Sequence, residues 1–552
     1  MGKINFGSVV TPTILSDGKS MDKAFELLSI DVLREMNRIP YATLVLLAGD
    51  TPQKEFAISD DGFFEPGKTI EIKLRYEDGS EGDVSVFKGL VVKHSVEAGE
   101  QGMLLSVEIK DAAVKMTRVR NNKIYKDKTD SDIISGLLSD NGLTAGKIPT
   151  TKTTHKSMVQ YYCTDWDFML SRAEANGLMV LAENGKISLY EIKISGNAKY
   201  TFEFGMDDIT NFEIDLDANH QFAAIEAVAW DPKEQKLTPV SKASEFSLKQ
   251  GNLSASKVAK SLGGASQTLA SPVELTPNEL KAWADASMAK SRMSLIRGHL
   301  LVPGSGEINP ADVINIAGIG ARFNGDTLIT GVHHRVDGQG WQSNIQFGLT
   351  AERFSTQANI LDALAAGRLP AINGLQVGIV TDIQDPLNEL RVAIQLPALG
   401  ATADTVWARL GSIYAGKDHG AIFIPEVGDE VVVGFFNDDP TQPVVLGSLY
   451  SGKNTPPKTP DEIDSKNLDK VIISKTGLTL AFIDADKPKV FIETPNKNTI
   501  ILDDDTESIK LSDQHGNTIT MSKDGIEIKS AKDFKIDASG NVEIKGAKVD
   551  VK

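Results

Sequence analysis

The most regular hydrophobic pattern in the chain lies between Val471 and Lys552. Apolar residues there come in pairs separated by a single residue, so both side chains of a pair lie on the same face of a short strand. The pairs recur about every ten residues up to Met521 and about every seven or eight residues after it. This segment is therefore predicted to be a repeat array of short β-strands. The pairs are Val490/Ile492, Ile500/Leu502, Ile509/Leu511, Ile519/Met521, Ile526/Ile528, Phe534/Ile536, Val542/Ile544 and Val549/Val551.

Such an array needs neighbours, because two apolar residues per strand bury too little surface to stabilise it alone. Three copies wound about one axis would place every pair inside a narrow prism and leave Lys, Asp and Glu outside. An antiparallel meander is the alternative, since short strands between turns are also typical of sandwiches and barrels. The trimeric needle hypothesis predicts a core formed by Ile519, Met521, Ile526, Ile528, Phe534, Ile536, Val542 and Ile544.

The first 200 residues combine strand and helix patterns. Between Ile70 and Tyr76 apolar residues alternate with charged ones, which is typical of a half-buried sheet. A helix is predicted over 130–141, which has an apolar face, a polar cap and a following glycine, and a second one over 165–176, which Gly177 ends. Asn184-Gly185 is typical of a hairpin turn between two strands.

A second β-rich part is predicted over about 200–350. Thr276-Pro277-Asn278-Glu279 has the cap, the early proline and the third-position Glu of a helix start, and Gly298 is expected to end that helix. Strands are predicted over 313–316, 327–332 and 344–347. The Ser-, Ala-, Lys- and Gly-rich stretch 241–271 is expected to be a long mobile loop. This part therefore reads as a second β-barrel with one helix packed on it.

Composition and charge exclude some classes of binding partner for this chain. The 552 residues suggest three or four domains, and the net charge of −17 without a basic stripe argues against nucleic acid and anionic membranes. Cys163 is the only cysteine, as expected for a chain that folds in a reducing cytoplasm. The start MGKINFGSVV lacks the apolar core of an export signal, and no apolar run approaches the roughly 20 residues that span a bilayer.

Two regions carry a family resemblance. Residues Val159 to Leu189 read VQYYCTDWDFMLSRAEANGLMVLAENGKISL, and residues Gly374 to Gly452 include GLQVGIVTDIQDPLNELRVAIQLPAL and GAIFIPEVGDEVVVGFFNDDPTQPVVLGSLYSG. Both resemble VgrG spike proteins of type VI secretion systems and the related hub proteins of contractile phage tails and extracellular injection particles. The second region resembles the OB-fold domain of that family, and alternating strands such as Val392 to Leu396 fit a small barrel.

The resemblance implies a mainly β chain with four parts. A hub region over 1–370 would hold two β-barrels with inserted helices, and an OB-fold domain would follow over 371–452. A linker over 453–470, marked by Pro456, Pro457 and Pro460, would lead to a triple-stranded β-helix needle over 471–552. The family architecture thus favours the trimeric needle over the meander.

Each candidate chemical site has a simpler structural interpretation. Gly318-Ile319-Gly320 lacks the third glycine of a nucleotide loop and is predicted to be a turn. His333 and His334 are adjacent in a predicted strand and would point to opposite faces. The run Asp503 to Asp505 is expected to be a solvated corner of the needle. We therefore expect no catalytic residue, metal or cofactor, and no enzymatic activity; the linker is also too short for the lysozyme domain of some relatives.

The resemblance implies a structural role as the trimeric puncturing spike at the tip of a contractile injection apparatus. Its expected partners are two further copies of the chain, an Hcp-like tube protein, baseplate proteins, effector cargo and a PAAR-type tip protein, with membranes met only by puncture. The tip protein is expected to bind Val549, Asp550, Val551 and Lys552. The protein would be made in the cytoplasm and delivered outside the cell within the particle. A carbohydrate- or receptor-binding tail fibre is the alternative function.

Overall fold

The computed structural model describes residues 9–48, 56–78, 82–99, 102–206, 209–357, 360, 363–400, 404–457 and 465–551. The chain divides into two compact units, unit 1 (Met1–Asp362) and unit 2 (Ala363–Lys552). Each unit has its own buried hydrophobic clusters, so each is described separately below.

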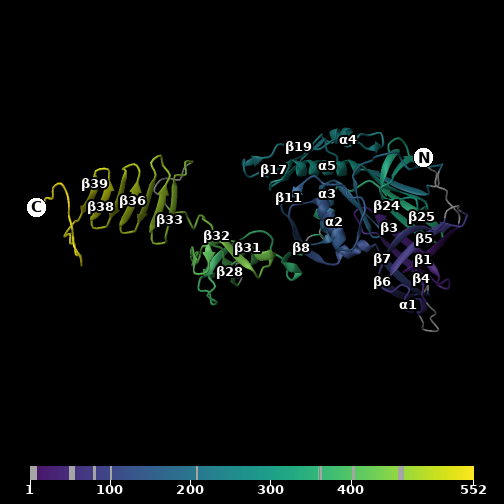
Figure 1. Ribbon diagram of the computed structural model, residues 1–552, viewed down its shortest axis with the longest axis horizontal. Helices are drawn as coiled ribbons and strands as arrows, with labels where there is room; N and C mark the ends of the chain where they lie inside the picture. Colours follow the sequence, from purple (N-terminus) through teal and green to yellow (C-terminus); the bar gives the residue numbers. More distant parts are fainter. Residues whose placement is uncertain are drawn as a thin grey trace. The chain divides into compact units, whose positions relative to one another are not determined.

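A sheet of fourteen strands forms the frame of unit 1 (Figure 1). Its strands come both from the first 110 residues and from residues 200–347, and the two sets join where β3 pairs antiparallel with β24. The strands are β1 (Val10–Ser16), β2 (Lys19–Ser20), β3 (Leu27–Glu35), β4 (Tyr41–Leu47), β5 (Thr69–Tyr76), β6 (Val84–Gly99), β7 (Gly102–Lys110), β15 (Tyr200–Glu203), β16 (Asn211–Leu216), β20 (Lys249–Gln250), β22 (Ile296–Pro303), β23 (Val313–Ala317), β24 (Gly325–Asp337) and β25 (Gly340–Phe347).

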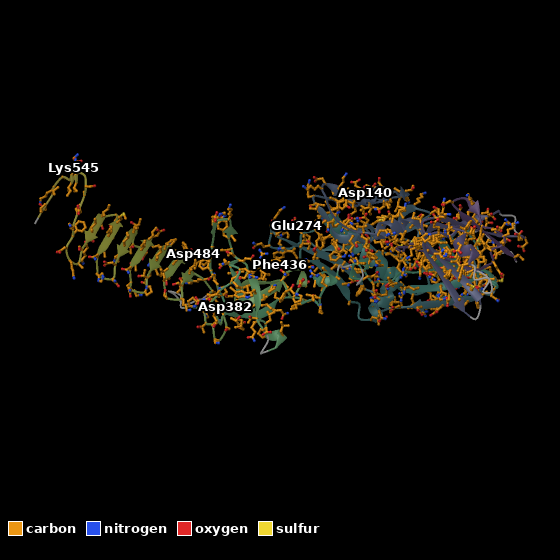
Figure 2. The ribbon with its side chains drawn as sticks, turned by 90° about the horizontal axis from the view of Figure 1, so that it is seen from below. Asp140, Glu274, Asp382, Phe436, Asp484 and Lys545 are labelled. Atoms are coloured by element: carbon orange, nitrogen blue, oxygen red, sulfur yellow. The ribbon has the colours of Figure 1, made fainter. Side chains whose placement is uncertain are left out.

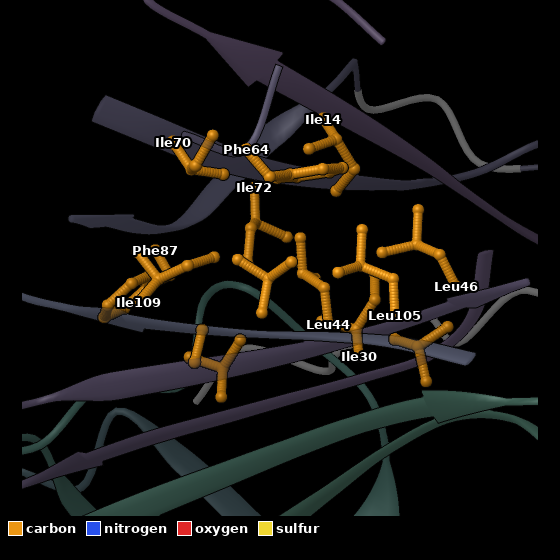
Figure 3. Close-up of a cluster of buried hydrophobic side chains, with 14 of the residues drawn as sticks. Ile14, Ile30, Leu44, Leu46, Phe64, Ile70, Ile72, Phe87, Leu105 and Ile109 are labelled. Carbon is orange, nitrogen blue, oxygen red and sulfur yellow. The ribbon is translucent and has the colours of Figure 1, made fainter. Parts of the chain in front are cut away.

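The two sets of strands enclose two separate cores within one continuous sheet, so the two separate barrels expected for this part of the chain stay a prediction. The first core gathers Ile and Leu side chains of β1, β3, β4, β5 and β7 around Phe64 and Phe87, all of them almost fully buried (Figure 3). The second core gathers apolar side chains of β15, β22, β23, β24 and β25. Strict alternation of buried and partly exposed residues, as in Tyr41–Leu47 and Gly340–Phe347, explains why one face of each strand enters a core.

Helices and a smaller sheet form a third core in unit 1. Helix α2 (Asp130–Asp140) begins with a capping box from Thr129, and α3 (Asp165–Ala175) begins with a cap from Thr164. Helix α3 packs on the hairpin of β13 (Leu178–Glu183) and β14 (Lys186–Glu191), which turns at Asn184-Gly185 as predicted, and α2 packs against α3 within the same core. The ribbon of β8 (Arg120–Tyr125) and β12 (Met158–Thr164) precedes α3.

The prediction of a long loop over 241–271 is wrong. This stretch contains β19 (Ser241–Lys242), β20, α4 (Ala255–Ser261) and β21 (Ser266–Ser271). Strand β21 pairs in parallel with β17 (Ala224–Asp231), about 40 residues earlier in the chain, and α4 buries Ala255, Val258 and Ala259. The sequence shows little hydrophobic periodicity here, because β21 depends on a distant partner strand and α4 buries only small side chains.

Helix α5 (Pro277–Met293) covers the sheet formed by β17 and β21. It begins with the predicted capping box of Thr276 and Glu279, with Pro277 at its first position. It ends at Met293 rather than at Gly298, because Ile296 already opens β22. Its buried face includes Leu280, Ala284 and Met288, which pack with Ile225 and Leu269.

Unit 2 begins with a closed five-stranded barrel, which confirms the small barrel predicted for this region. The order around the barrel is β26, β27, β28, β32 and β31. Its core is formed by β-branched residues such as Val392, Ile394, Val431 and Val433, all essentially without exposed surface. The strands are β26 (Gln376–Asp382), β27 (Arg391–Gln395), β28 (Val406–Leu410), β31 (Glu430–Phe435) and β32 (Pro443–Ser448).

The rest of unit 2 is a meander of seven strands, which we call the needle sheet (Figure 1). Every strand has five residues and pairs antiparallel with the next one. The sequence left open a trimeric needle and an antiparallel meander. Within one chain, the strands pair as an antiparallel meander. The strands are β33 (Asp469–Ile473), β34 (Thr479–Ile483), β35 (Lys489–Glu493), β36 (Thr499–Asp503), β37 (Ser508–Ser512), β38 (Thr518–Ser522) and β39 (Gly525–Lys529).

Candidate trimerisation surface

One face of the needle sheet carries two continuous columns of apolar side chains. The central residues of successive strands are paired. From β34 to β39, the second and fourth residues of each strand, which are apolar, therefore lie beside the apolar second and fourth residues of the next. We call this the two-column face. One column consists of Phe482, Val490, Leu502, Ile509, Met521 and Ile526, and the other of Leu480, Ile492, Ile500, Leu511, Ile519 and Ile528.

Most side chains of this face are exposed in the single chain, whereas Leu480 and Val490 are partly buried. Met521 is 37% exposed, Ile528 is 56% exposed and Ile526 is 72% exposed. In Figure 2, where Asp484 lies near the start of the needle sheet and Lys545 lies beyond it, the strands form a single layer. A contiguous apolar surface of this length is uncommon on a soluble monomer and marks an interaction surface.

The opposite face of the needle sheet changes its chemistry along the segment. Its central column consists of Val471, Ala481, Phe491 and Ile501 and then continues with Lys510, Thr520 and Glu527. A polar, charged column is compatible with water, whereas the two-column face stays apolar from β34 to β39. The two-column face is therefore the one that requires a partner.

Charged side chains gather at the turns of the needle sheet. Lys489 lies 2.9 Å from Asp503, and Lys487 lies 2.6 Å from Asp505, so two of the three carboxylates in the run 503–505 pair with lysines. The hydrogen bond from Lys489 lowers the pKa of Asp503. Among the residues that the structure describes, no three His, Cys, Asp or Glu side chains come together as metal ligands. Asp505 thus pairs on an exposed corner, whereas the Asp503 side chain, at the end of β36, is only 10% exposed.

After β39 the apolar pairs continue without secondary structure. Residues 530–551, which we call the tail, lie outside every helix and strand. Four predicted core residues lie in the tail, and all are more than half exposed: Phe534, Ile536, Val542 and Ile544. The first tail residues, with Phe534 among them, line a groove of about 1030 Å³ together with Ile500 and Ile519 of the two-column face.

The predicted cap-binding residues lie at the end of the tail. Val549 is about half exposed, and Val551 is 93% exposed. Asp550 lies 2.8 Å from Lys548, so its carboxylate has a partner within the tail. Lys552, the fourth residue of this prediction, lies outside the described residues.

Unit 1 contains a buried ionic cluster that sequence reasoning missed. Arg172 donates two hydrogen bonds to Asp130, at 2.7 and 3.0 Å, and Asn176 donates a third at 2.8 Å. The ring of His155 lies between Asp130, at 3.2 Å, and Glu279, at 3.5 Å. Burial alone would raise the pKa of Asp130, but Arg172, Asn176 and His155 hold it below its ordinary value. A carboxylate with every oxygen engaged is suited to joining α2, α3 and α5 rather than to acid–base catalysis.

The adjacent histidines of β24 lie on opposite faces, as the strand period predicts. His333 lies 3.1 Å from Asp31 on the half-exposed face, whereas His334 is fully buried with its Nδ1 2.8 Å from the Ser343 hydroxyl. Burial, with the nearby charges of Arg34 and His333, lowers the pKa of His334 well below its ordinary value. The glycines Gly318 and Gly320 lie in the turn between β23 and β24, which confirms that prediction.

Three family models match the chain. Residues 7–338, more than half of the chain, match the model described as the Alg8 N-terminal domain. Residues 376–450, which include the closed barrel, match the type VI secretion system/phage-baseplate injector OB domain. Residues 489–552, which include β35 to β39 and the tail, match the phage baseplate V C-terminal trimerisation domain.

Curated relatives match shorter segments. The actin cross-linking toxin VgrG1 of Vibrio cholerae is 39% identical over 82 residues, which are 14% of this chain and 8% of that protein. The type VI secretion system spike protein VgrG5 of Pseudomonas aeruginosa is 36% identical over 96 residues, which are 16% of this chain and 12% of that protein. The matches thus span 8% to 12% of these relatives. The 43 kDa tail protein of prophage MuSo2 from Shewanella oneidensis is similar in structure, with a TM-score of 0.46 and 13% identity over 62% of this chain and 99% of that one.

Among the helices of the described ranges, none is both long and apolar enough to cross a membrane.

Proposed function

Because the chain belongs to the family described as the Alg8 N-terminal domain and is a spike protein of the VgrG type, we propose that three copies form the puncturing spike of a contractile injection apparatus. The observation that carries this proposal is the exposed two-column face, which lies in the segment that matches a trimerisation domain. A spike must bear force at a narrow end, and a trimeric needle with an apolar core would provide a stiff, narrow element.

In the proposed trimer the three two-column faces turn toward a common axis. Full burial of an exposed Ile, Leu or Met side chain contributes about 1.5 to 3 kcal/mol, and the side chains of the columns would gain the part of this that matches their remaining exposure. The core would begin with the columns of β34 to β39, including Ile519, Met521, Ile526 and Ile528. The polar column of Lys510, Thr520 and Glu527 would face water.

The tail extends the same core in this proposal. Its apolar pairs Phe534/Ile536 and Val542/Ile544 keep the spacing of strand residues, yet in the described single chain no strand includes them. Backbone groups that lack a partner in their own chain can pair with neighbouring chains, which act as the missing strands. The tail would therefore form strands with the neighbouring chains when the trimer assembles.

Other partners follow from the relatives that are spike proteins of type VI secretion systems. We propose that unit 1 contacts an Hcp-like tube protein and baseplate proteins, and that the spike carries effector cargo out of the cell. A PAAR-type protein would pack on Val549, Asp550, Val551 and Lys552, because Val549 and Val551 are exposed apolar side chains of the tail.

The native mass of the purified full chain tests the proposal. We expect three times the chain mass of 59.5 kDa in light scattering, over a wide range of concentration. A single-chain mass at micromolar concentration would contradict the trimer and with it the spike.

Deleting residues 549–552 tests the cap site separately. Trimer content is expected to stay unchanged, because the columns of β34 to β39 remain, whereas recovery of the tip protein in a pull-down with the shortened spike should fall to background. Equal recovery from the full and the shortened chain would place the tip protein elsewhere.

A further inference from the structure

The two ends of the closed barrel differ in the apolar surface that they expose. Strand β32 runs toward the end from which the chain continues to the needle sheet. Strand β28 pairs in parallel with β32, and both β26 and β32 pair antiparallel with β31, so β26 and β28 run toward this same end. The loops that follow β26 and β28, residues 383–390 and 411–429, therefore lie at the needle-proximal end of the barrel.

These loops carry a dense group of exposed apolar side chains. Ile413 is 91% exposed, and Ile422 and Phe423 are 69% and 66% exposed. At the opposite end of the barrel the exposed large apolar residues are fewer within the described ranges, Leu399 and Phe436 among them. We call the group at the needle-proximal end the barrel-end patch. It consists of Ile383, Leu387, Leu390, Ile413, Tyr414, Ile422, Phe423, Ile424 and Val427.

The main loop of the patch is held in one conformation by its own backbone. The short strands β29 (Ala415–Gly416) and β30 (His419–Gly420) form a hairpin. The N–H of Ala421 donates to the Tyr414 carbonyl at 2.8 Å, and the Ser412 hydroxyl donates to the Ala421 carbonyl at 2.7 Å. A loop fixed in this way presents Ile413 and Phe423 as a prepared surface, which lowers the entropy lost when a partner binds.

The position and chemistry of the patch indicate its partner. Glu426, at the end of the loop, lies 2.8 Å from Lys475 in the turn between β33 and β34, so the patch adjoins the first strands of the needle sheet. Side chains in contact with the base of a threefold needle lie close to the neighbouring copies. The runs 412–414 and 420–425 contain no charged residue, and they contribute Tyr and Phe, the composition of an interface core.

We propose that the barrel-end patch packs against a neighbouring copy of this chain at the base of the needle, so that the trimer interface extends from the needle sheet onto the barrel. This inference rests on the proposed trimer. It assigns part of the trimer's stability to residues 411–429, which lie before the segment that matches the trimerisation domain.

Photo-crosslinking in the full chain tests this inference. The photoreactive residue benzoylphenylalanine replaces Phe423 in one variant and Leu399, which is similarly exposed at the opposite end of the barrel, in the control. After light scattering has shown the mass of each variant, irradiation is expected to join copies of the chain through position 423 and not through position 399.

Three results would overturn the inference. A trimer that gives no crosslink from position 423 would show that the patch faces away from the other copies. Crosslinks from position 423 to a different protein in a cell extract would show that another partner covers the patch. A single-chain mass of the unmodified protein would contradict the proposed function itself, and thus the two failures are distinguishable.

Subunit exchange gives a second, independent measurement. Trimers that carry two different tags are mixed, and the rate at which mixed trimers appear is followed. The double variant Ile413→Ser/Phe423→Ser is expected to exchange at least tenfold faster than the unmodified protein, whereas Leu399→Ser should exchange at the unmodified rate. Equal rates for the double variant and the control would contradict the inference even if both variants fold normally.

Discussion

His334 is a titratable side chain that the fold keeps away from water on every side. It lies on β24 between β3, which places Arg34 nearby, and β25, which supplies the Ser343 hydroxyl and the Trp341 ring. Its neighbour His333 points to the other face, toward Asp31. Since burial and the charge of Arg34 oppose protonation, the native protein holds this imidazole neutral.

The stability of unit 1 should therefore fall on acidification. Below pH 6.5, the ordinary pKa of the side chain, the unfolded chain binds a proton at His334 that the native chain does not. Unfolding then becomes easier by about 1.4 kcal/mol per pH unit from this group. Urea unfolding of unit 1 between pH 5 and 7.5 measures the slope. His334→Gln should reduce the slope, and His333→Gln should keep it; equal slopes in all three proteins would contradict the assignment.

The Asp130 cluster should depend strongly on Arg172. Arg172→Met removes the cation and leaves a buried carboxylate with only Asn176 and His155 beside it, so we expect a loss of about 3 to 5 kcal/mol in unfolding free energy. The control is Lys123→Met, which breaks the exposed pair with Asp140 (labelled in Figure 2) and should cost about 1 kcal/mol or less. Thermal unfolding compares the two variants. Equal losses of unfolding free energy would show that the buried pair stabilises the fold no more than the exposed pair does.

The sequence predicts the surroundings of these individual side chains only where a local rule applies. The opposite orientations of His333 and His334 follow from the period of a strand, and the turn at Gly318 follows from its composition. Nothing local connects Asp130 with Arg172 and His155, or His155 with Glu279, because these residues come from elements far apart in the chain. Their meeting depends on how α2, α3 and α5 pack, and no single-sequence pattern encodes that packing.

At the scale of elements, the strongest local signals were reliable. The capping box of Thr276 and Glu279, the Asn184-Gly185 turn and the alternation in β5 all specify their structure within a few residues. The prediction of a loop over 241–271 was wrong because β21 forms a strand by pairing with β17, and its own composition does not indicate a strand. In the needle sheet, the spacing predicted which side chains share a face, whereas the pairing within one chain and between chains required the structure.

The two faces of β38 should respond differently to a charge. Ile519 lies in the two-column face and Thr520 lies in the polar column of the other face. Ile519→Asp would bring three carboxylates together near the proposed axis at a cost of several kcal/mol each before relaxation, so the trimer should dissociate. Thr520→Asp, the matched control, should change stability by less than about 0.5 kcal/mol.

Light scattering and melting temperature measure both variants. If Ile519→Asp formed trimers as stable as those of Thr520→Asp, the two-column face would be the solvated face, and the proposed core would be wrong.

At the scale of the whole molecule, unit 1 carries its own cores and the association surface lies in unit 2. A chain truncated after Tyr450 should therefore keep the melting transition of unit 1 and lose the needle sheet, so that it dissociates to single chains on dilution. Sedimentation at several concentrations measures this. A tight trimer of the truncated chain would place the main interface in unit 1 or in the barrel.

The order of the two units along the chain also determines the order in which they are translated. Residues 363–552 leave the ribosome after unit 1, and at about 5 to 20 residues per second their translation takes roughly 10 to 40 seconds. Unit 1 can bury its cores during that interval, while no copy yet displays the two-column face. The surface most prone to unspecific association is thus translated after unit 1. Nascent chains on one messenger can therefore fold unit 1 before their two-column faces meet.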